Sequence, residues 1–454
     1  MKRILACLIV LYLLCCCAAA ETVSLPVTAE GAIFGGTAGD KISLTLDFDT
    51  AWVTQADNTV YNPDLAAACA LLCADSYFRA KDVDKGTANR VVVDGAEEYT
   101  NTALLTALGY GDVRYIESYK VKQVEFDGND SATLLLGYRD ADGCDSYVVV
   151  LRGCFSIGER LSCFDVGADT EEYFALTGEH PEWTDTAVYK GLSVAAERAE
   201  EFVKEYMAEH DRADCPDTVL VTGHSRGADV ALLVGAALED EGVKSYTYTF
   251  NTMPVSAEVG EYKTIFNIFD TNDYYSDPLP IGGEKAVRPG TDVCADIASD
   301  AALRAAIAEV KGRDDYQSLS AELKAEYDGL FAARFPSRAS LYEMRTVTES
   351  YASAEEAAAR REEVVSFIDG FGIGAFCSVS EVSGENTLEI RFCGAALLFG
   401  LAQIQAYGAV AYDAYVSLLA SDEAGCRLAK IVFDNAAAIT GGHLLVNGYV
   451  LSAR

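Results

Sequence analysis

Apolar and polar residues follow one another along the chain with two different periods. Residues 64–79 and 186–209 place apolar side chains at helical spacing, which predicts two helices. Strands are predicted where the pattern alternates or stays apolar, over residues 42–54, 131–140, 146–154, 218–222, 245–252 and 263–270. The turn at 140–145 joins two of these strands into a hairpin, and a further apolar helix is predicted over 226–238. Strands that alternate with helices predict an α/β fold with a mostly parallel central sheet flanked by helices.

The composition changes in the C-terminal half. Residues 285–392 are rich in Ala, Glu, Arg and Lys and predict a mainly helical insertion or cap. The segment 393–420 is nearly uncharged and long enough to span a membrane, but its Gln, Asp and Tyr residues favour a helix buried in a large core. We therefore expect an N-terminal strand region at 21–60, a core at 61–284, the insertion, and a C-terminal part of the core at 393–454.

The first twenty residues have the pattern of a secretory signal peptide. Lys2 and Arg3 precede a short apolar run, and small residues at Ala18 and Ala20 predict cleavage after Ala20. This predicts a secreted or extracytoplasmic protein without a stable transmembrane anchor. The Cys residues at 15–17 raise the alternative of a lipid-modified N-terminus, which the residues before them disfavour.

Charge and metal-binding residues exclude several classes of function. The formal net charge is −35, and a chain without a basic face is not expected to bind nucleic acid. The chain has 4 His and no CxxC or HExxH motif, so we predict neither a metal nor a cofactor. Cys69 and Cys73, four residues apart on a predicted helix, are interpreted as small core residues rather than a metal pair.

The stretch "TVLVTGHSRGADVALLVGAAL" at 218–238 carries the candidate chemistry. Ser225 lies between a predicted strand and a predicted helix, with Gly223 and Gly227 on either side. A nucleophilic Ser at such a sharp turn is lifted above the sheet, at the N-terminus of the helix. A lone GxSxG motif is weak, and the alternative is an ordinary Ser in a Gly-rich turn.

A Ser nucleophile needs a base and an acid. After a strand–turn–helix elbow of this kind, the acid comes next along the chain and the His comes last. His443 is the one His after Ser225, and we predict it as the base; a His in a surface loop is the alternative. Asp270, Asp273 and Asp277 follow a predicted strand, and their positions alone do not choose among them. The predicted oxyanion donors are the backbone N–H groups of Arg226 and Cys154.

Five motifs in order resemble the class 3 lipases, a fungal-lipase-like branch of the α/β hydrolases. "VVVLRGC" resembles the family's oxyanion motif, and "VLVTGHSRGADVAL" resembles its nucleophile elbow. "AVYKGL" is similar to a segment between them, "NIFDTNDYYSDPLP" to the acid loop, and "GGHLLVNGY" to the terminal His and Tyr. The resemblance covers roughly residues 60–285 and 395–454. It implies an α/β-hydrolase fold and favours Asp273 as the acid, with Asp270 as the alternative.

The chain departs from the family pattern at several positions. Arg226 stands where the family has Leu, which suggests a preference for substrates that carry a carboxylate or phosphate. Cys154 replaces the oxyanion Thr, and the spacing between acid and His is far longer than in the family. The aromatic residues of 155–185 occupy the lid position, where they either gate a lipid site or simply pack.

The expected function is a secreted serine hydrolase that cleaves carboxylic esters through an acyl-enzyme, with the catalytic residues Ser225, His443 and Asp273. The expected substrates are acylglycerols, other lipid esters or small esters, met in solution or at a lipid–water interface. Two alternatives stay open. One is an exported binding protein with a degenerate site, and the other is a peptidase or carbohydrate esterase on the same fold.

Overall fold

The structure is a computed structural model, and the residues described below are those that it places. They are 22–30, 41–78, 90–95, 100–118, 132–141, 143–154, 159, 190–212, 215–255, 260–270, 273, 287–295, 299–330, 345–371, 377–382, 386–392 and 431. The predicted signal peptide, the lid-position segment, the segment 393–420 and His443 lie outside the described residues. So does the Asp277 candidate.

A 7-stranded sheet forms the centre of the molecule, in the order β10-β9-β8-β7-β6-β5-β4. Its strands are β4 (Gly111–Ser118), β5 (Ala132–Ala141), β6 (Cys144–Leu151), β7 (Asp217–His224), β8 (Lys244–Phe250), β9 (Ile265–Asp270) and β10 (Thr291–Ala295). Strands β6 to β10 are parallel, and β4 and β5 run antiparallel as a meander into β6. The predicted α/β class with a mostly parallel sheet is confirmed.

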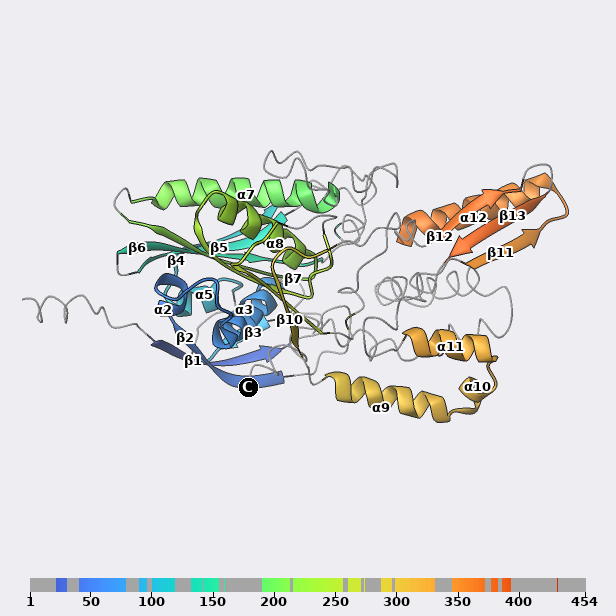
Figure 1. The fold of residues 1–454 in the computed structure, drawn as a ribbon, viewed down its shortest axis with the longest axis horizontal. Coiled ribbons are helices and arrows are strands. Elements are labelled where there is room, and N and C mark those ends of the chain that lie inside the picture. Colours follow the sequence, from blue (N-terminus) through green and yellow to red (C-terminus); the bar gives the residue numbers. More distant parts are fainter. Residues whose placement is uncertain are drawn as a thin grey trace, which may run out of the picture.

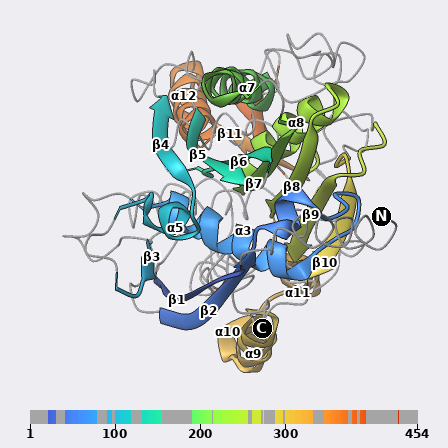
Figure 2. The same ribbon diagram turned by 90° about the vertical axis from the view of Figure 1, so that its left-hand side faces the viewer.

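Helices cover both faces of this sheet (Figures 1 and 2). Helices α7 (Lys190–His210) and α8 (Arg226–Asp240) pack together on one face. Helix α3 (Pro63–Ser76) packs on the other face, next to the short helices α2 (Ala51–Thr54) and α5 (Ala103–Ala107). A second sheet covers α3 from outside, in the order β2-β1-β3, and consists of β1 (Thr22–Glu30), β2 (Lys41–Asp49) and β3 (Arg90–Val93).

The alternation of apolar residues along the strands supplies a core on each side of the sheet. In β5, Leu134 and Leu136 pack towards α7 and α8, whereas Leu135 packs towards α3. Helix α3 lies between two sheets, which explains why it is apolar nearly all round. Cys69 and Cys73 are fully buried there, as predicted, and burial raises the pKa of the Cys73 thiol to about 12.

The described part of the predicted insertion at 285–392 contains a small sheet besides its helices. It contains the helices α9 (Ser299–Gly312), α10 (Asp314–Gln317), α11 (Ala321–Leu330) and α12 (Ala354–Phe371). It also contains an antiparallel sheet in the order β11-β13-β12, which consists of β11 (Arg345–Ser350), β12 (Cys377–Glu381) and β13 (Thr387–Phe392). Leu388 and Ile390 in β13 are buried and alternate with more exposed residues, which is strand periodicity within a helix-rich composition. Strand β10 continues the central sheet past the boundary expected at residue 284.

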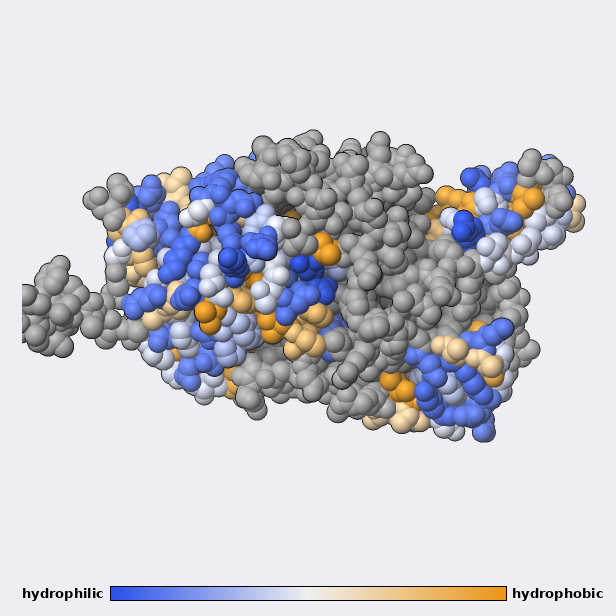
Figure 3. Space-filling view, viewed as in Figure 1, coloured by the Kyte–Doolittle hydropathy of each residue, from blue (hydrophilic) through white to orange (hydrophobic). Residues whose placement is uncertain are grey.

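The described surface is predominantly polar. Hydrophilic side chains cover most of it over the central sheet and over α9–α11, with smaller hydrophobic areas between them (Figure 3). Among the described residues, no helix is both long and apolar enough to cross a membrane.

Candidate active site

Ser225 occupies a strained turn between β7 and α8. Its φ is 57° and its ψ is −133°, a conformation that L-residues rarely adopt outside tight functional turns. The Ser225 N–H donates to the carbonyl of Phe250 at 2.9 Å, and the Ser225 carbonyl accepts from the N–H of Ala228 at 2.7 Å. These bonds join the turn both to the neighbouring strand and to the first turn of the helix. The predicted order of strand, turn and helix is confirmed, and a positive-φ Ser between a strand and a helix is the geometry that a nucleophile elbow requires.

The two glycines of the motif are required by contacts within the elbow. A β-carbon on Gly223 would overlap the carbonyl group of Gly227, and one on Gly227 would lie 2.6 Å from the carbonyl carbon of Arg152. Neither residue has a positive φ, so lack of space, rather than backbone conformation, selects glycine. The elbow is therefore packed backbone against backbone.

Strand register brings several loops to the same edge of the sheet. Leu151 pairs with Gly223, His224 pairs with Phe250, and Phe250 pairs with Ile268. Because these strands are parallel, the residues that follow them emerge together at the carboxyl edge, where ligands of open α/β sheets bind. Ser225, the predicted oxyanion loop and the acid candidates Asp270 and Asp273 are found at this edge.

The predicted oxyanion loop contacts the elbow directly. A β-carbon on Gly153 would lie 2.5 Å from the carbonyl oxygen of His224 and 3.1 Å from Cβ of Ser225. Cys154 follows Gly153 and is buried. Cys154 and Arg226 are thus the residues that directly follow Gly153 and Ser225, the two residues that meet here.

A buried ion pair holds the start of this loop. The Arg152 guanidinium donates to Oε1 of Glu159 at 3.0 Å and to the hydroxyl of Tyr115 at 2.9 Å. Both charged side chains are almost completely buried, whereas Glu117, 3.6 Å from Arg152, is partly exposed. A buried pair of this kind holds its partners in one geometry, because separating them would leave a charge without water.

The two acid candidates lie on the strand after the next, β9, and on the turn that follows it. Asp270 ends β9, and the N–H of Asp273 donates to the Asp270 carbonyl at 3.0 Å. Both side chains are buried, Asp273 completely so. The turn brings both carboxyl groups to the edge that holds Ser225, and Asp273 remains the candidate that the motif favours.

Two of the four His residues are described, and neither position suits a base for Ser225. His224 is fully buried, and its Nδ1 lies 2.8 Å from the Tyr77 hydroxyl on the α3 side of the sheet. His210 ends α7 and stacks on Tyr138, with its Nε2 2.8 Å from Asp112. Tyr138 pairs with Tyr147 near the start of β6, which places His210 at the edge opposite Ser225.

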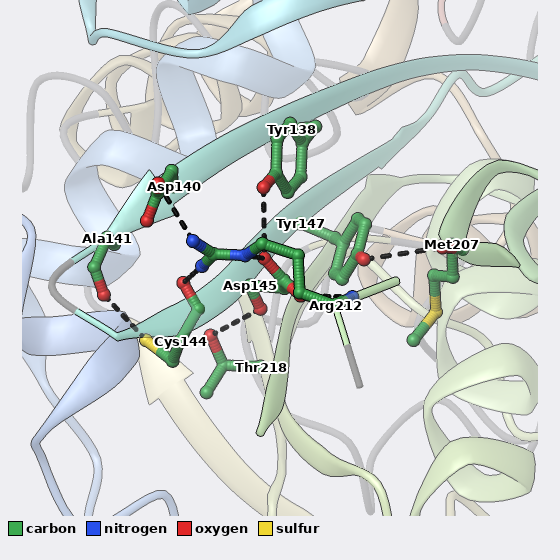
Figure 4. Close-up of polar contacts among 9 residues, drawn as sticks. All are labelled: Tyr138, Asp140, Ala141, Cys144, Asp145, Tyr147, Met207, Arg212 and Thr218. Atoms are coloured by element: carbon green, nitrogen blue, oxygen red, sulfur yellow. Dashed lines mark hydrogen bonds and ion pairs between the residues drawn. The ribbon is translucent and has the colours of Figure 1, made fainter. Parts of the chain in front are cut away.

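That opposite edge carries a polar network of its own (Figure 4). Asp145 is fully buried and accepts from Nε of Arg212 at 2.6 Å, from the Arg212 N–H at 3.0 Å and from the Tyr138 hydroxyl at 2.9 Å. Arg212 also pairs with Asp140 at 2.8 Å. The network joins the end of α7 to the turn of the β5–β6 hairpin.

Among the described residues, the acidic groupings with metal-ligand spacing also lie at this opposite edge. They are Asp112, Glu209 and His210, and Asp145, Asp211 and Asp217. Arg114 bonds to both carboxylates of the first grouping, and Arg212 bonds to the buried carboxylate of the second. These Arg side chains take the place of a cation, so neither grouping is assigned as a metal site.

Residues of the site that the sequence analysis did not single out include Tyr77, Tyr115 and Glu159. The signal for Tyr77 is small: an aromatic residue with a polar tip directly follows a helix that is otherwise apolar. Glu159 and Tyr115 carry no periodic signal, because each reaches Arg152 from another part of the chain.

Comparisons with known proteins give only distant similarities. No protein-family model matches the chain, and no curated protein matches it. Among solved structures, the triacylglyceride lipase of Rhizomucor miehei is 17% identical over 51% of this chain and 79% of that chain, with a TM-score of 0.33. The Lip2 lipase of Yarrowia lipolytica is 15% identical over 51% and 77%, with a TM-score of 0.33. Values this low carry no conclusion about what this chain does, so its function is inferred from the geometry above.

Proposed function

We propose that the protein is a serine hydrolase that cleaves carboxylic esters, with Ser225 as the nucleophile. The observation that carries this proposal is the positive-φ Ser225 at the carboxyl edge of a parallel sheet, in contact with Gly153. A strained Ser that begins a helix is costly for stability and is maintained where it serves a reaction. An ordinary Ser in a Gly-rich turn requires neither the positive φ nor the neighbouring loop.

The proposed base is His443, and the proposed acid is Asp273. The positions of His210 and His224 support this choice, because one lies at the opposite edge and the other is bonded to Tyr77. His443 takes the proton of the Ser225 hydroxyl as the hydroxyl attacks the ester carbonyl, and Asp273 orients the imidazole and stabilises its charged form. Asp270 is the alternative acid, and its burial beside Asp273 keeps it a candidate.

The proposed oxyanion hole consists of the N–H groups of Cys154 and Arg226. The contact between Gly153 and Ser225 supports it, because the N–H of the residue after Gly153 then lies close to the reacting carbonyl. The alcohol leaves with the proton from His443, and a water molecule then attacks the acyl-enzyme with His443 as base again. Each of two such donors typically contributes about 3 kcal/mol to transition-state stabilisation.

The proposed substrates are lipid esters or small esters, met by a secreted enzyme. The distant structural neighbours are described as triacylglycerol lipases, which agrees with this substrate class without deciding it. The N-terminal pattern of residues 1–20 supports export.

The test compares the purified protein with its Ser225→Ala variant on p-nitrophenyl esters from acetate to palmitate. We expect turnover by the wild type and a loss on the order of 10³-fold or more in kcat for the variant. The chain-length profile then separates a lipase from a short-chain esterase. If neither protein turns over any ester and a fluorophosphonate probe labels neither, the hydrolase proposal is rejected in favour of a binding protein.

A further inference from the structure

Three segments that are distant in the sequence meet directly beneath the nucleophile. Tyr77 follows α3 on the inner face of the sheet, His224 ends β7, and Gly153 follows β6. The Tyr77 hydroxyl lies 2.8 Å from Nδ1 of His224, and the two rings pack edge to face with centroids 5.7 Å apart. His224 and Ser225 are consecutive, so the position of this ring is tied to the position of the nucleophile.

Gly153, in the predicted oxyanion loop, contacts the Tyr77 hydroxyl as well. A β-carbon at Gly153 would overlap the Tyr77 hydroxyl oxygen and would lie 2.5 Å from the His224 carbonyl oxygen. The backbone of Gly153 therefore rests on the phenol oxygen with no room for any side chain. One oxygen atom touches both the segment that carries the nucleophile and the segment that carries the proposed oxyanion donor.

The support beneath this oxygen is rigid. Tyr77 is 1% exposed, and Cys73, one helical turn earlier, contacts the Thr222 hydroxyl through its sulfur at 3.3 Å. Thr222 precedes His224 by two residues, so α3 is attached to β7 at two successive points on the same face. Burial raises the pKa of the Tyr77 phenol well above its usual range, so the hydroxyl keeps its proton at neutral pH.

We propose that Tyr77 is a positioning residue, whose hydroxyl sets the spacing between Ser225 and the N–H of Cys154 by holding the His224 ring on one side and the Gly153 backbone on the other. This inference rests on the proposed ester hydrolysis. Losing this spacing should lower the rate of the chemical step, because an oxyanion hole acts only when its donors are about 3 Å from the developing charge. An error of about 1 Å in such a position can reduce the rate on the order of 10²-fold.

The test uses the variants Tyr77→Phe and His224→Leu in the full-length protein. Tyr77→Phe removes only the hydroxyl, and we expect kcat to fall roughly 10- to 100-fold with KM changed by less than about twofold. His224→Leu removes the partner of that hydroxyl and is expected to give the same loss. The double variant is expected to lose no more than either single one, because both remove the same interaction. His224→Asn places an amide group where Nδ1 stood and is expected to recover most of the activity.

The matched control is Tyr206→Phe, which also removes a buried tyrosine hydroxyl that is hydrogen-bonded, here to the Asp112 carbonyl at 2.8 Å. Tyr206 lies at the opposite edge of the sheet, so its variant is expected to keep the wild-type kcat. All rates are divided by the concentration of sites that a fluorophosphonate labels at its end point, which removes any unfolded fraction from the comparison.

Three outcomes would overturn the proposal. A Tyr77→Phe variant with wild-type kcat shows that the hydroxyl positions nothing. A loss in Tyr77→Phe without a loss in His224→Leu shows that the hydroxyl does not act through the His224 ring, so it does not set the spacing between the two segments. If the wild-type protein has no esterase activity, the proposed function fails, and this inference fails with it. That result is known before any variant is compared.

Discussion

Gly227, in the first turn of α8, packs directly against the end of β6, where a β-carbon would overlap the carbonyl oxygen of Leu151. This contact lets the nucleophile turn and the neighbouring loop approach each other as backbone on backbone. Helix α8, strand β6 and the elbow can thus pack this closely only because residue 227 is a glycine. The geometry of the site therefore depends on a residue without a functional side chain.

Replacing this glycine should therefore destabilise the protein. We expect Gly227→Ala to lower the free energy of unfolding by about 2–3 kcal/mol, because the added methyl group forces α8 away from the end of β6. The measurement is urea unfolding followed by circular dichroism. The control is Gly312→Ala at the end of α9, where a β-carbon meets nothing within 4 Å and stability should stay within about 0.5 kcal/mol. Equal stability of both variants would contradict the packing constraint.

Arg226 gives a prediction about substrate charge. Its side chain is buried directly after the proposed nucleophile Ser225, and a cation beside the proposed acyl site should favour an anionic acyl group. We expect Arg226→Leu to reduce kcat/KM roughly tenfold, or ~1.4 kcal/mol, for an ester whose acyl chain ends in a carboxylate. The neutral ester of matched length should change less than about twofold, and Arg226→Lys should keep the preference. A parallel loss on both esters would mean that Arg226 has only a structural role.

Asp75 predicts a dependence of stability on pH. The carboxyl group is 1% exposed in α3, its Oδ2 has no hydrogen-bond partner within the described part of the chain, and burial raises its pKa well above the usual value. The folded protein therefore holds this proton more tightly than the unfolded chain does. The stabilisation is complete below the unfolded pKa of about 3.9 and is lost as pH rises towards the folded pKa, at up to about 1.4 kcal/mol per pH unit.

The variant Asp75→Asn removes this titration while keeping the shape of the side chain. We expect its stability relative to the wild type to increase between about pH 5 and about pH 7, in urea unfolding at each pH. Wild-type and variant curves that stay parallel over this range would show that Asp75 does not hold a proton in the folded state.

Arg212 gives a prediction that separates stability from activity. Arg212→Met leaves the buried Asp145 carboxylate without its cation, so we expect a lower free energy of unfolding than for the wild type. The network lies at the edge opposite Ser225, so kcat/KM for an ester should stay within about twofold.

Arg198→Met is the matched control for this variant. Arg198 is about as exposed as Arg212, at 38% against 36%, but its partner Glu201 is 59% exposed, whereas Asp145 is buried. Its loss should cost less than about 1 kcal/mol. If both variants lost the same stability, burial of the partner would not be the cause.

Periodicity predicted the elements that form the frame of the site. Apolar spacing predicted strand β7 and the helices α7 and α8. The two glycines between strand and helix predicted the sharp turn at Ser225. The interaction between Tyr77 and His224 could not be predicted in this way, since the two residues are 147 positions apart and neither belongs to a repeating pattern. The small sheet of β11, β12 and β13 was not expected because polar Thr, Ser and Glu residues occupy much of it. Tertiary pairing, rather than composition, selects strands there.

The register of the central sheet has a consequence for how sequence changes are tolerated. Leu151 lies opposite Gly223, and His224 lies opposite Phe250, through backbone hydrogen bonds that any residue except proline can make. Many side-chain replacements along these strands should therefore leave the positions of Cys154 and Ser225 unaltered. Deleting one residue from β6 has a different effect, because it draws the following loop back by about 3.3 Å and turns the rest of the strand over. Apart from the close contacts at Gly153, Gly223 and Gly227, the backbone frame of the site should thus be more sensitive to a change in strand length than to substitutions along the strands.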